Sequence, residues 1–207
     1  MTISLAHIQG VIFDLDGTLV DSRLDFDAIR AAIDCPEGTG VLEHIDMLPD
    51  EQARRSAHAV VRHYEQRGAE AATWMPGAEG MLAVLREHGF PLGILTRNAR
   101  DIATATAQRL GIQVDVILGR EDCPPKPDPQ GLLHIAARWE IPPERLIYVG
   151  DFSYDMLAAR RAGMLACLYD PAGTGEHAGL ADLVLTAFPS LAEQLTLPGV
   201  RRTYRGA

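Results

Sequence analysis

Short apolar runs alternate with amphipathic helical patterns along most of the chain. Continuous apolar runs bounded by turn residues are typical of strands buried on both faces, and their alternation with helices predicts a parallel sheet wrapped by crossover helices. The expected strands are Val11–Phe13, Leu92–Leu95, Val114–Leu118, Leu146–Val149, Leu165–Tyr169 and Leu183–Leu185. The expected helices between them are Ala78–His88, Ala99–Leu110, Pro129–Trp139 and Tyr154–Ala162. The pattern therefore predicts an α/β fold.

The segment from Ser22 to Trp74 breaks this alternation, because it contains no strand-like run. It carries three helical patterns, at Phe26–Ile33, Gly40–Met47 and Glu51–Arg67. A segment of this kind inserted after the first strand predicts a small all-helical subdomain. We expect an α/β core of residues 1–21 and 76–207 and a helical cap of residues 22–75. Such a cap could cover a site on the core and exclude water from it.

The composition and net charge of the sequence limit the kinds of molecule that the protein can bind. The sequence has 207 residues, of which 47% are hydrophobic, and its formal net charge of −9 disfavours binding to nucleic acid or to an anionic membrane surface. No apolar run approaches the roughly 18 residues that span a bilayer, and the three widely spaced cysteines suggest neither a disulfide framework nor a zinc site. We expect a soluble, cytoplasmic protein that is a monomer or a weak homodimer, with a solvated tail from Pro198.

Two carboxylates one residue apart, Asp14 and Asp16, directly follow the first expected strand. Like charges this close resist joint ionisation, which is how one site can hold both a base and an acid near neutral pH. In an extended backbone the side chains at i and i+2 point to the same side. Gly17 permits a sharp turn that exposes backbone N–H groups to an anion. The pattern favours a catalytic site over a structural role.

Further polar residues follow other expected strands, at the sheet edge where ligands bind in open parallel sheets. Thr96 ends the second strand, so its hydroxyl and the amides of Arg97 and Asn98 could hold phosphoryl oxygens. Lys126 follows the third strand, between prolines that restrict its backbone.

Asp151 and Asp155 follow the fourth expected strand, and their i, i+4 spacing on the turn into a helix makes them face one way. A phosphate dianion approaching all these carboxylates, with Lys126 as the one obvious cation, would be strongly repelled. A divalent cation is therefore required, and oxygen-only ligands favour Mg²⁺.

Four motifs together resemble those of the haloacid dehalogenase-like hydrolase superfamily. They are Asp14-x-Asp16-Gly-Thr, Ile94-Leu95-Thr96, Pro125-Lys126-Pro127 and Gly150-Asp151-x-x-x-Asp155, and the resemblance extends from about residue 8 to residue 190. The helical insertion is similar to a compact form of the cap of phosphoglycolate-phosphatase-like members. The resemblance implies a Rossmann-like, three-layer core with a mobile cap and magnesium-dependent hydrolysis of a small phosphorylated metabolite. Phosphoglycolate as that metabolite is a guess from the family alone.

The resemblance also implies roles for these residues. Mg²⁺ would be held by Asp14, the backbone carbonyl of Asp16, and Asp151. Asp155 would orient Lys126 or a metal-bound water. Asp14 would attack phosphorus to give an aspartyl-phosphate, and Asp16 would protonate the leaving alkoxide and then deprotonate water. Thr96 and Lys126, with backbone amides after Asp14, would stabilise the charge that develops on the phosphoryl oxygens.

Several alternatives remain beside a phosphatase. An acid at Asp16 favours phosphoryl chemistry over displacement of halide, and the absence of lysine from residues 22–74 argues against phosphonate hydrolysis through a Schiff base. A phosphoglucomutase-like transfer shares the Asp16 acid and stays open, as does a non-catalytic sensor of a phosphorylated metabolite. In the cap, Arg30 is the candidate to meet a carboxylate of the substrate.

Overall fold

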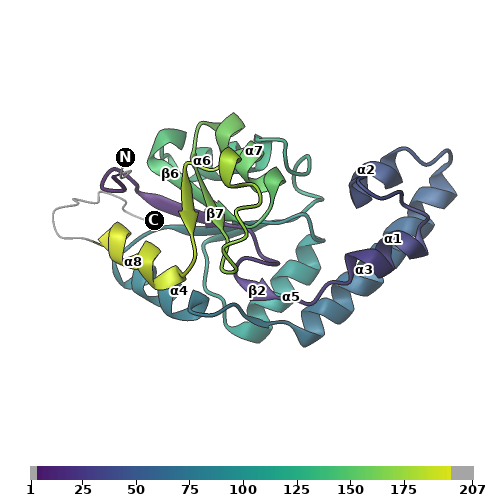
Figure 1. The fold of residues 1–207 in the computed structure, drawn as a ribbon, viewed down its shortest axis with the longest axis horizontal. Helices are drawn as coiled ribbons and strands as arrows, with labels where there is room; N and C mark the ends of the chain where they lie inside the picture. The colour runs from purple at the N-terminus through teal and green to yellow at the C-terminus, as the bar shows by residue number, and fades with distance from the viewer. Residues whose placement is uncertain (1–3, 197–207) are drawn as a thin grey trace. The chain divides into compact units, whose positions relative to one another are not determined.

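A computed structural model describes residues 4–196, so the predicted solvated tail from Pro198 lies outside the described residues. The chain forms two compact units. The first is Ser22–Ala72, and the second combines the segment that ends at Asp21 with the segment that begins at Thr73. The second of these is built on a six-stranded sheet (Figure 1). Its strands, in spatial order, are β5 (Val116–Leu118), β4 (Leu92–Leu95), β1 (Gly10–Phe13), β6 (Leu146–Gly150), β7 (Leu165–Tyr169) and β8 (Leu183–Leu185).

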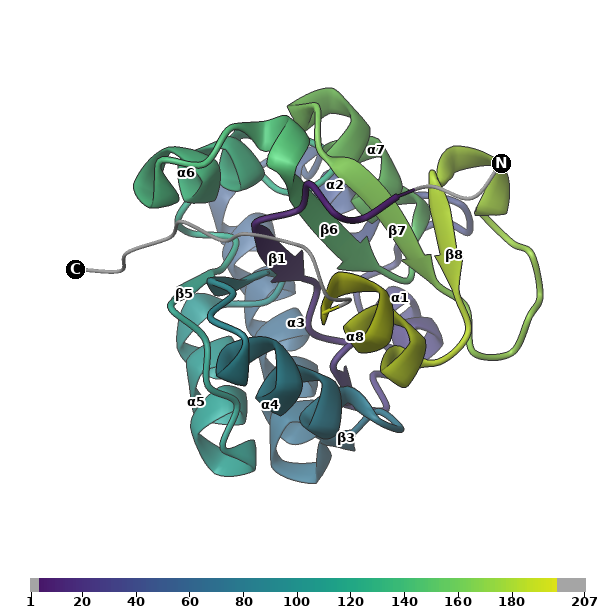
Figure 2. The same cartoon turned by 90° about the vertical axis from the view of Figure 1, so that its left-hand side faces the viewer.

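All neighbouring strands of this sheet run parallel, and helices cover both of its faces. Figure 2 shows α6 (Gln130–Trp139) and α7 (Ser153–Ala162) on one face. The other face carries α4 (Ala78–Glu87), α5 (Arg100–Leu110) and α8 (Phe188–Thr196). On the α6 and α7 side, Ile12 and Tyr148 of the sheet share a buried cluster with Leu132 and Met156. The predicted three-layer α/β fold is confirmed.

The strand predictions hold closely, with two corrections. The strand expected from Val114 begins at Val116, because Asp115 bonds to Leu92 in another way. The backbone N–H of Asp115 donates to the carbonyl oxygen of Leu92, and its carboxylate accepts from the N–H of Leu92. The prediction that no strand lies between Ser22 and Trp74 is wrong for the last two residues of that segment. They form β3 (Thr73–Trp74), which pairs antiparallel with β2 (Val20–Asp21). Two residues are too few to show strand periodicity in a sequence.

The unit Ser22–Ala72 is helical and has its own apolar core. It consists of α1 (Phe26–Ala32), α2 (Val41–Asp46) and α3 (Glu51–Ala71). Asp25 and Asp50 cap α1 and α3, accepting hydrogen bonds from backbone N–H groups in the first turn of each helix at 2.9 and 2.8 Å. Among residues 4–196, no helix combines the length and the apolar character needed to cross a bilayer.

Candidate active site

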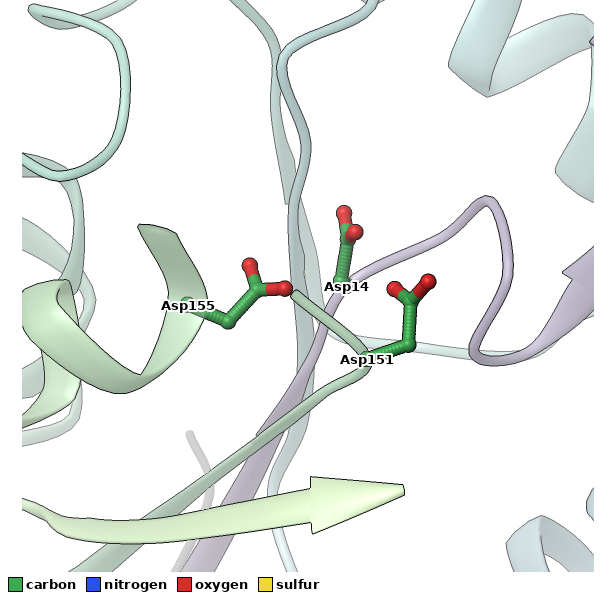
Figure 3. Close-up of side chains that lie close together, drawn as sticks. All are labelled: Asp14, Asp151 and Asp155. Carbon is green, nitrogen blue, oxygen red and sulfur yellow. The ribbon is translucent and has the colours of Figure 1, made fainter. Parts of the chain in front are cut away.

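Three carboxylates meet at the carboxyl edge of the sheet (Figure 3). Asp14 directly follows β1 and Asp151 directly follows β6, and these two strands are parallel neighbours. Asp155 lies in the first turn of α7. One oxygen atom of each carboxylate lies within 4.8 Å of the others. The parallel pairing of β1 and β6 thus gathers acidic groups from residues far apart in the sequence.

Lys126 lies inside this cluster. Its side chain is only 3% exposed, and its Nζ lies 2.8 Å from Asp14 Oδ1 and 2.6 Å from Asp155 Oδ1. Nζ also lies 2.9 Å from the hydroxyl of Tyr148. An ammonium carries three N–H donors, so these three acceptors use all of them. Lys126 is also the only lysine in the sequence.

The backbone around Lys126 is fixed by arginines from two other elements. Arg97, in the loop after β4, donates to the carbonyl oxygen of Lys126. Arg161, on α7, donates to the carbonyl oxygen of Pro127 at 2.9 Å. The loop that carries the ammonium is therefore held from both the β4 and the α7 side.

Burial and charge shift the pKa values of the cluster. Burial raises the pKa of Asp14 well above its ordinary value; the Lys126 ammonium opposes this, and the neighbouring carboxylates of Asp155 and Asp151 add to it. Burial, followed by the charge of Asp155, raises the pKa of Asp151 to about 6. Burial disfavours the charged form of Lys126, but Asp14 and Asp155 outweigh it and raise its pKa. Three carboxylates around one ammonium leave an excess of negative charge in the cluster.

The turn after Asp14 depends on Gly17. Its φ is +78°, as the predicted sharp turn requires, and a Cβ on this residue would lie 2.3 Å from Asp151 Oδ2. The next residue, Thr18, is buried and donates its hydroxyl to Asp151 Oδ1 at 3.1 Å. Glycine at position 17 therefore lets the turn approach Asp151 closely enough for Thr18 to orient it.

Asp16 points to a different partner. Its Oδ2 accepts a hydrogen bond from the side-chain amide of Asn98 at 2.6 Å, and it does not belong to the group of three carboxylates. The backbone N–H of Asn98 donates to the buried hydroxyl oxygen of Thr96 at 3.2 Å. The amide expected to face a phosphoryl oxygen thus already has an acceptor, and Asn98 holds Asp16 through its side chain instead.

Arg30 has local partners within the helical unit. Its Nη1 donates to the carbonyl oxygens of Pro36, at 3.3 Å, and of Thr39. These contacts brace the loop between α1 and α2. Binding of Arg30 to a substrate carboxylate stays a prediction.

Tyr148 has no role in the site as predicted from the sequence, and Thr18 enters that prediction only as part of the Asp14-x-Asp16-Gly-Thr motif. Tyr148 is fully buried in β6, and its hydroxyl donates to the carbonyl of Leu95 at 2.9 Å while accepting from Lys126. A tyrosine within an otherwise apolar, buried strand needs a hydrogen-bond partner for its hydroxyl. The position of Tyr148 in such a strand is therefore the feature of the sequence that could have indicated its place in the site.

Comparison with known proteins places this site in a family. The family model described as haloacid dehalogenase-like hydrolase matches residues 8–163. A haloacid dehalogenase-like hydrolase domain-containing protein of Arabidopsis thaliana is 34% identical over 83% of this chain and 75% of its own length. A plasmid-encoded phosphoglycolate phosphatase of Cupriavidus necator is 32% identical over 94% of this chain and 96% of its own.

Among solved structures, a hydrolase from Pseudomonas syringae superposes with a TM-score of 0.75 at 25% identity, covering 91% of this chain and 97% of that one. The matched family region contains the three clustered carboxylates and Lys126. The chain therefore belongs to the haloacid dehalogenase-like hydrolases, an enzyme family that includes its phosphoglycolate phosphatase relatives.

Proposed function

We propose that the enzyme is a magnesium-dependent phosphatase that hydrolyses a small phosphate monoester through an aspartyl-phosphate on Asp14. The observation that carries this proposal is the buried contact of Asp14 Oδ1 with Lys126, 2.8 Å long, beside Asp151 and Asp155. A nucleophilic carboxylate held by an ammonium and surrounded by further carboxylates suits attack on a phosphoryl group brought in with a cation. The phosphoglycolate phosphatase relatives support this substrate class.

The donor set fits Mg²⁺. The three clustered side chains offer only carboxylate oxygens, the hard ligands that Mg²⁺ prefers, and their excess negative charge calls for a divalent cation. Asp14 and Asp151, with the backbone carbonyl of Asp16, would hold the ion. Asp155 is the poorer ligand, because its Oδ1 bonds to Lys126 and its Oδ2 accepts from the N–H of Phe152 at 3.0 Å. Bound Mg²⁺ would neutralise charge on the phosphoryl oxygens as a Lewis acid.

The first chemical step needs a nucleophile and an acid. An oxygen of Asp14 attacks phosphorus in line, forming one P–O bond while the bond to the leaving group breaks. Asp16 gives its proton to the leaving oxygen. Asn98 fixes the side chain of Asp16 for this transfer, through the hydrogen bond of 2.6 Å.

The second step returns the enzyme to its starting state. Asp16 now takes a proton from water, the resulting hydroxide attacks phosphorus, and the bond between phosphorus and Asp14 breaks. In the free enzyme Asp14 and Asp155 raise the pKa of Lys126 and keep it charged, and Asp155 still faces the ammonium once Asp14 is esterified. Lys126 stabilises negative charge on the phosphoryl group together with Thr96 and nearby backbone amides.

Phosphate release from p-nitrophenyl phosphate tests this function. We expect activity with Mg²⁺, loss of activity with EDTA, and loss in Asp14→Asn. A matched control is Asp115→Asn, because the carboxylate of Asp115 accepts from the N–H of Leu92 at the opposite end of β4. Activity that survives EDTA or Asp14→Asn would contradict the mechanism.

A panel of phosphorylated metabolites, scored by phosphate release, would then rank physiological substrates. Phosphoryl transfer from one sugar phosphate to another without release of phosphate would favour the phosphoglucomutase-like alternative. Binding of esters without turnover would favour a sensor.

A further inference from the structure

Four planar side chains form a row at the carboxyl edge of the sheet. The rings of Phe152 and Tyr154 meet edge to face with centroids 5.3 Å apart, and the rings of Phe152 and His177 do so at 4.9 Å. The guanidinium carbon of Arg97 lies 4.7 Å from the centroid of the Tyr154 ring. We call Arg97, Tyr154, Phe152 and His177 the aromatic row.

The row is continuous with the proposed reaction centre. Phe152 directly follows Asp151, and its backbone N–H donates to Asp155. Arg97, at one end of the row, directly follows Thr96 and donates to the carbonyl oxygen of Lys126. The row therefore rests on the same loops that carry the phosphoryl-binding and carboxylate residues.

Phe152 is an unusual residue for its position. It is the N-cap of α7, where serine, threonine, aspartate and asparagine are preferred because their side chains accept from the first turn. Phenylalanine cannot accept such a bond, and Phe152 is 49% exposed, so it contributes little to the core. A residue that goes against the preference of its position without improving the packing is expected mainly at a functional site.

We propose that the aromatic row binds the leaving group of the substrate, and that the enzyme prefers phosphate esters whose alcohol carries a flat aromatic ring. This inference rests on the proposed phosphatase function. The exposed ring of Phe152 offers an edge and a face to a second ring, and Tyr154 is held in place by Arg97. An aromatic pair of this kind is expected to favour an aromatic ligand over a saturated one by about two- to tenfold.

Benzyl phosphate and cyclohexylmethyl phosphate form a matched pair of test substrates. Both are esters of primary alcohols and carry six-membered rings on one methylene, so they differ mainly in the flatness and π-electrons of the ring. We expect kcat/KM with Mg²⁺ to be about two- to tenfold higher for benzyl phosphate. The variants Phe152→Leu and Tyr154→Leu should each lower this ratio toward one.

Leu133→Ala is the control, because Leu133 is an exposed apolar residue of α6, 39% exposed, outside the row. It should leave the ratio unchanged, and thermal melts of all variants check folding. The dissociation constants of benzylphosphonate and cyclohexylmethylphosphonate, measured by calorimetry with Mg²⁺, should differ in the same direction without turnover.

The outcomes separate this inference from the function on which it rests. Equal hydrolysis of the two esters, or a benzyl preference that persists in both row variants, would overturn the inference and leave the phosphatase intact. Absence of phosphate release from both esters and from p-nitrophenyl phosphate would overturn the proposed function and this inference together.

Discussion

Asp151→Asn should make the metal-free protein more stable at pH 8, although it should impair the enzyme. In the folded protein, burial, followed by repulsion from Asp155, raises the pKa of Asp151 to about 6 from an ordinary value of 3.8. At pH 8 the wild-type side chain is ionised in surroundings that favour its neutral form. Asparagine carries no charge, and its Oδ1 can still accept the hydrogen bond from Thr18.

The size of the effect follows from the pKa difference. Each pKa unit corresponds to about 1.4 kcal/mol, so a shift of this size costs the ionised state at most about 3 kcal/mol, and less because Asp151 keeps part of its surface in water. When folding raises the pKa of a carboxyl, the group stabilises the folded state at pH values below its pKa in the unfolded protein. This stabilisation is lost as the pH rises through the pKa that the group has in the folded protein. The wild type should therefore lose this stability between about pH 4 and pH 6, and the variant should not.

Urea denaturation in EDTA at pH 4 and at pH 8 measures both effects. The difference in unfolding free energy between variant and wild type should favour the variant at pH 8 and shrink at pH 4. Mg²⁺ at a thousandfold excess over its Kd should reverse the order, because it adds about 4 kcal/mol to the protein that binds it. Asp115→Asn removes a carboxylate outside the cluster and should not stabilise. A metal-free Asp151→Asn protein less stable than the wild type at pH 8 would refute the reasoning.

Three further variants probe other contacts of the site. Tyr148→Phe should lower the unfolding free energy by about 1–3 kcal/mol, seen by urea denaturation, because it removes one of the three acceptors of Lys126. Asn98→Ala should lower kcat about tenfold with little change in KM, because Asp16 loses its orienting partner; a change confined to KM would contradict this. Gly17→Ala should cost about 1–3 kcal/mol of stability and weaken Mg²⁺ binding in calorimetry, because its φ is positive and its Cβ would meet a carboxylate.

The sheet could be predicted from the sequence because buried parallel strands have a direct compositional signal. The bounds of β4, β7 and β8 agree with the apolar runs in which they were predicted. Once the strands are parallel, residues that follow them must share one edge of the sheet. This is why Asp14, Lys126 and Asp151, which follow three different strands, lie together. Their catalytic and metal-binding roles stay predictions.

The rest of the site depends on contacts that no periodicity encodes. Asn98 reaches Asp16 across 82 positions of sequence, and the hydroxyl of Tyr148 reaches the carbonyl of Leu95 across 53. Such pairings depend on loop geometry and on side-chain direction, which hydrophobic patterns leave open. The aromatic row has the same origin, since Phe152 meets His177 only after two loops have folded beside each other.

The three hydrogen bonds of the Lys126 ammonium indicate which of its contacts would change in the proposed reaction. Asp155 is held by the N–H of Phe152, and Tyr148 is held by the carbonyl of Leu95, so these two acceptors are fixed by the protein. Asp14 is the remaining acceptor, and in the proposed mechanism its carboxylate would lose negative charge on becoming esterified to phosphate. The N–H group that faces Asp14 in the free enzyme is then the one best placed to follow the charge onto a phosphoryl oxygen. In the proposed mechanism Lys126 would therefore act as an anchored donor that stabilises the transition state without a change of rotamer.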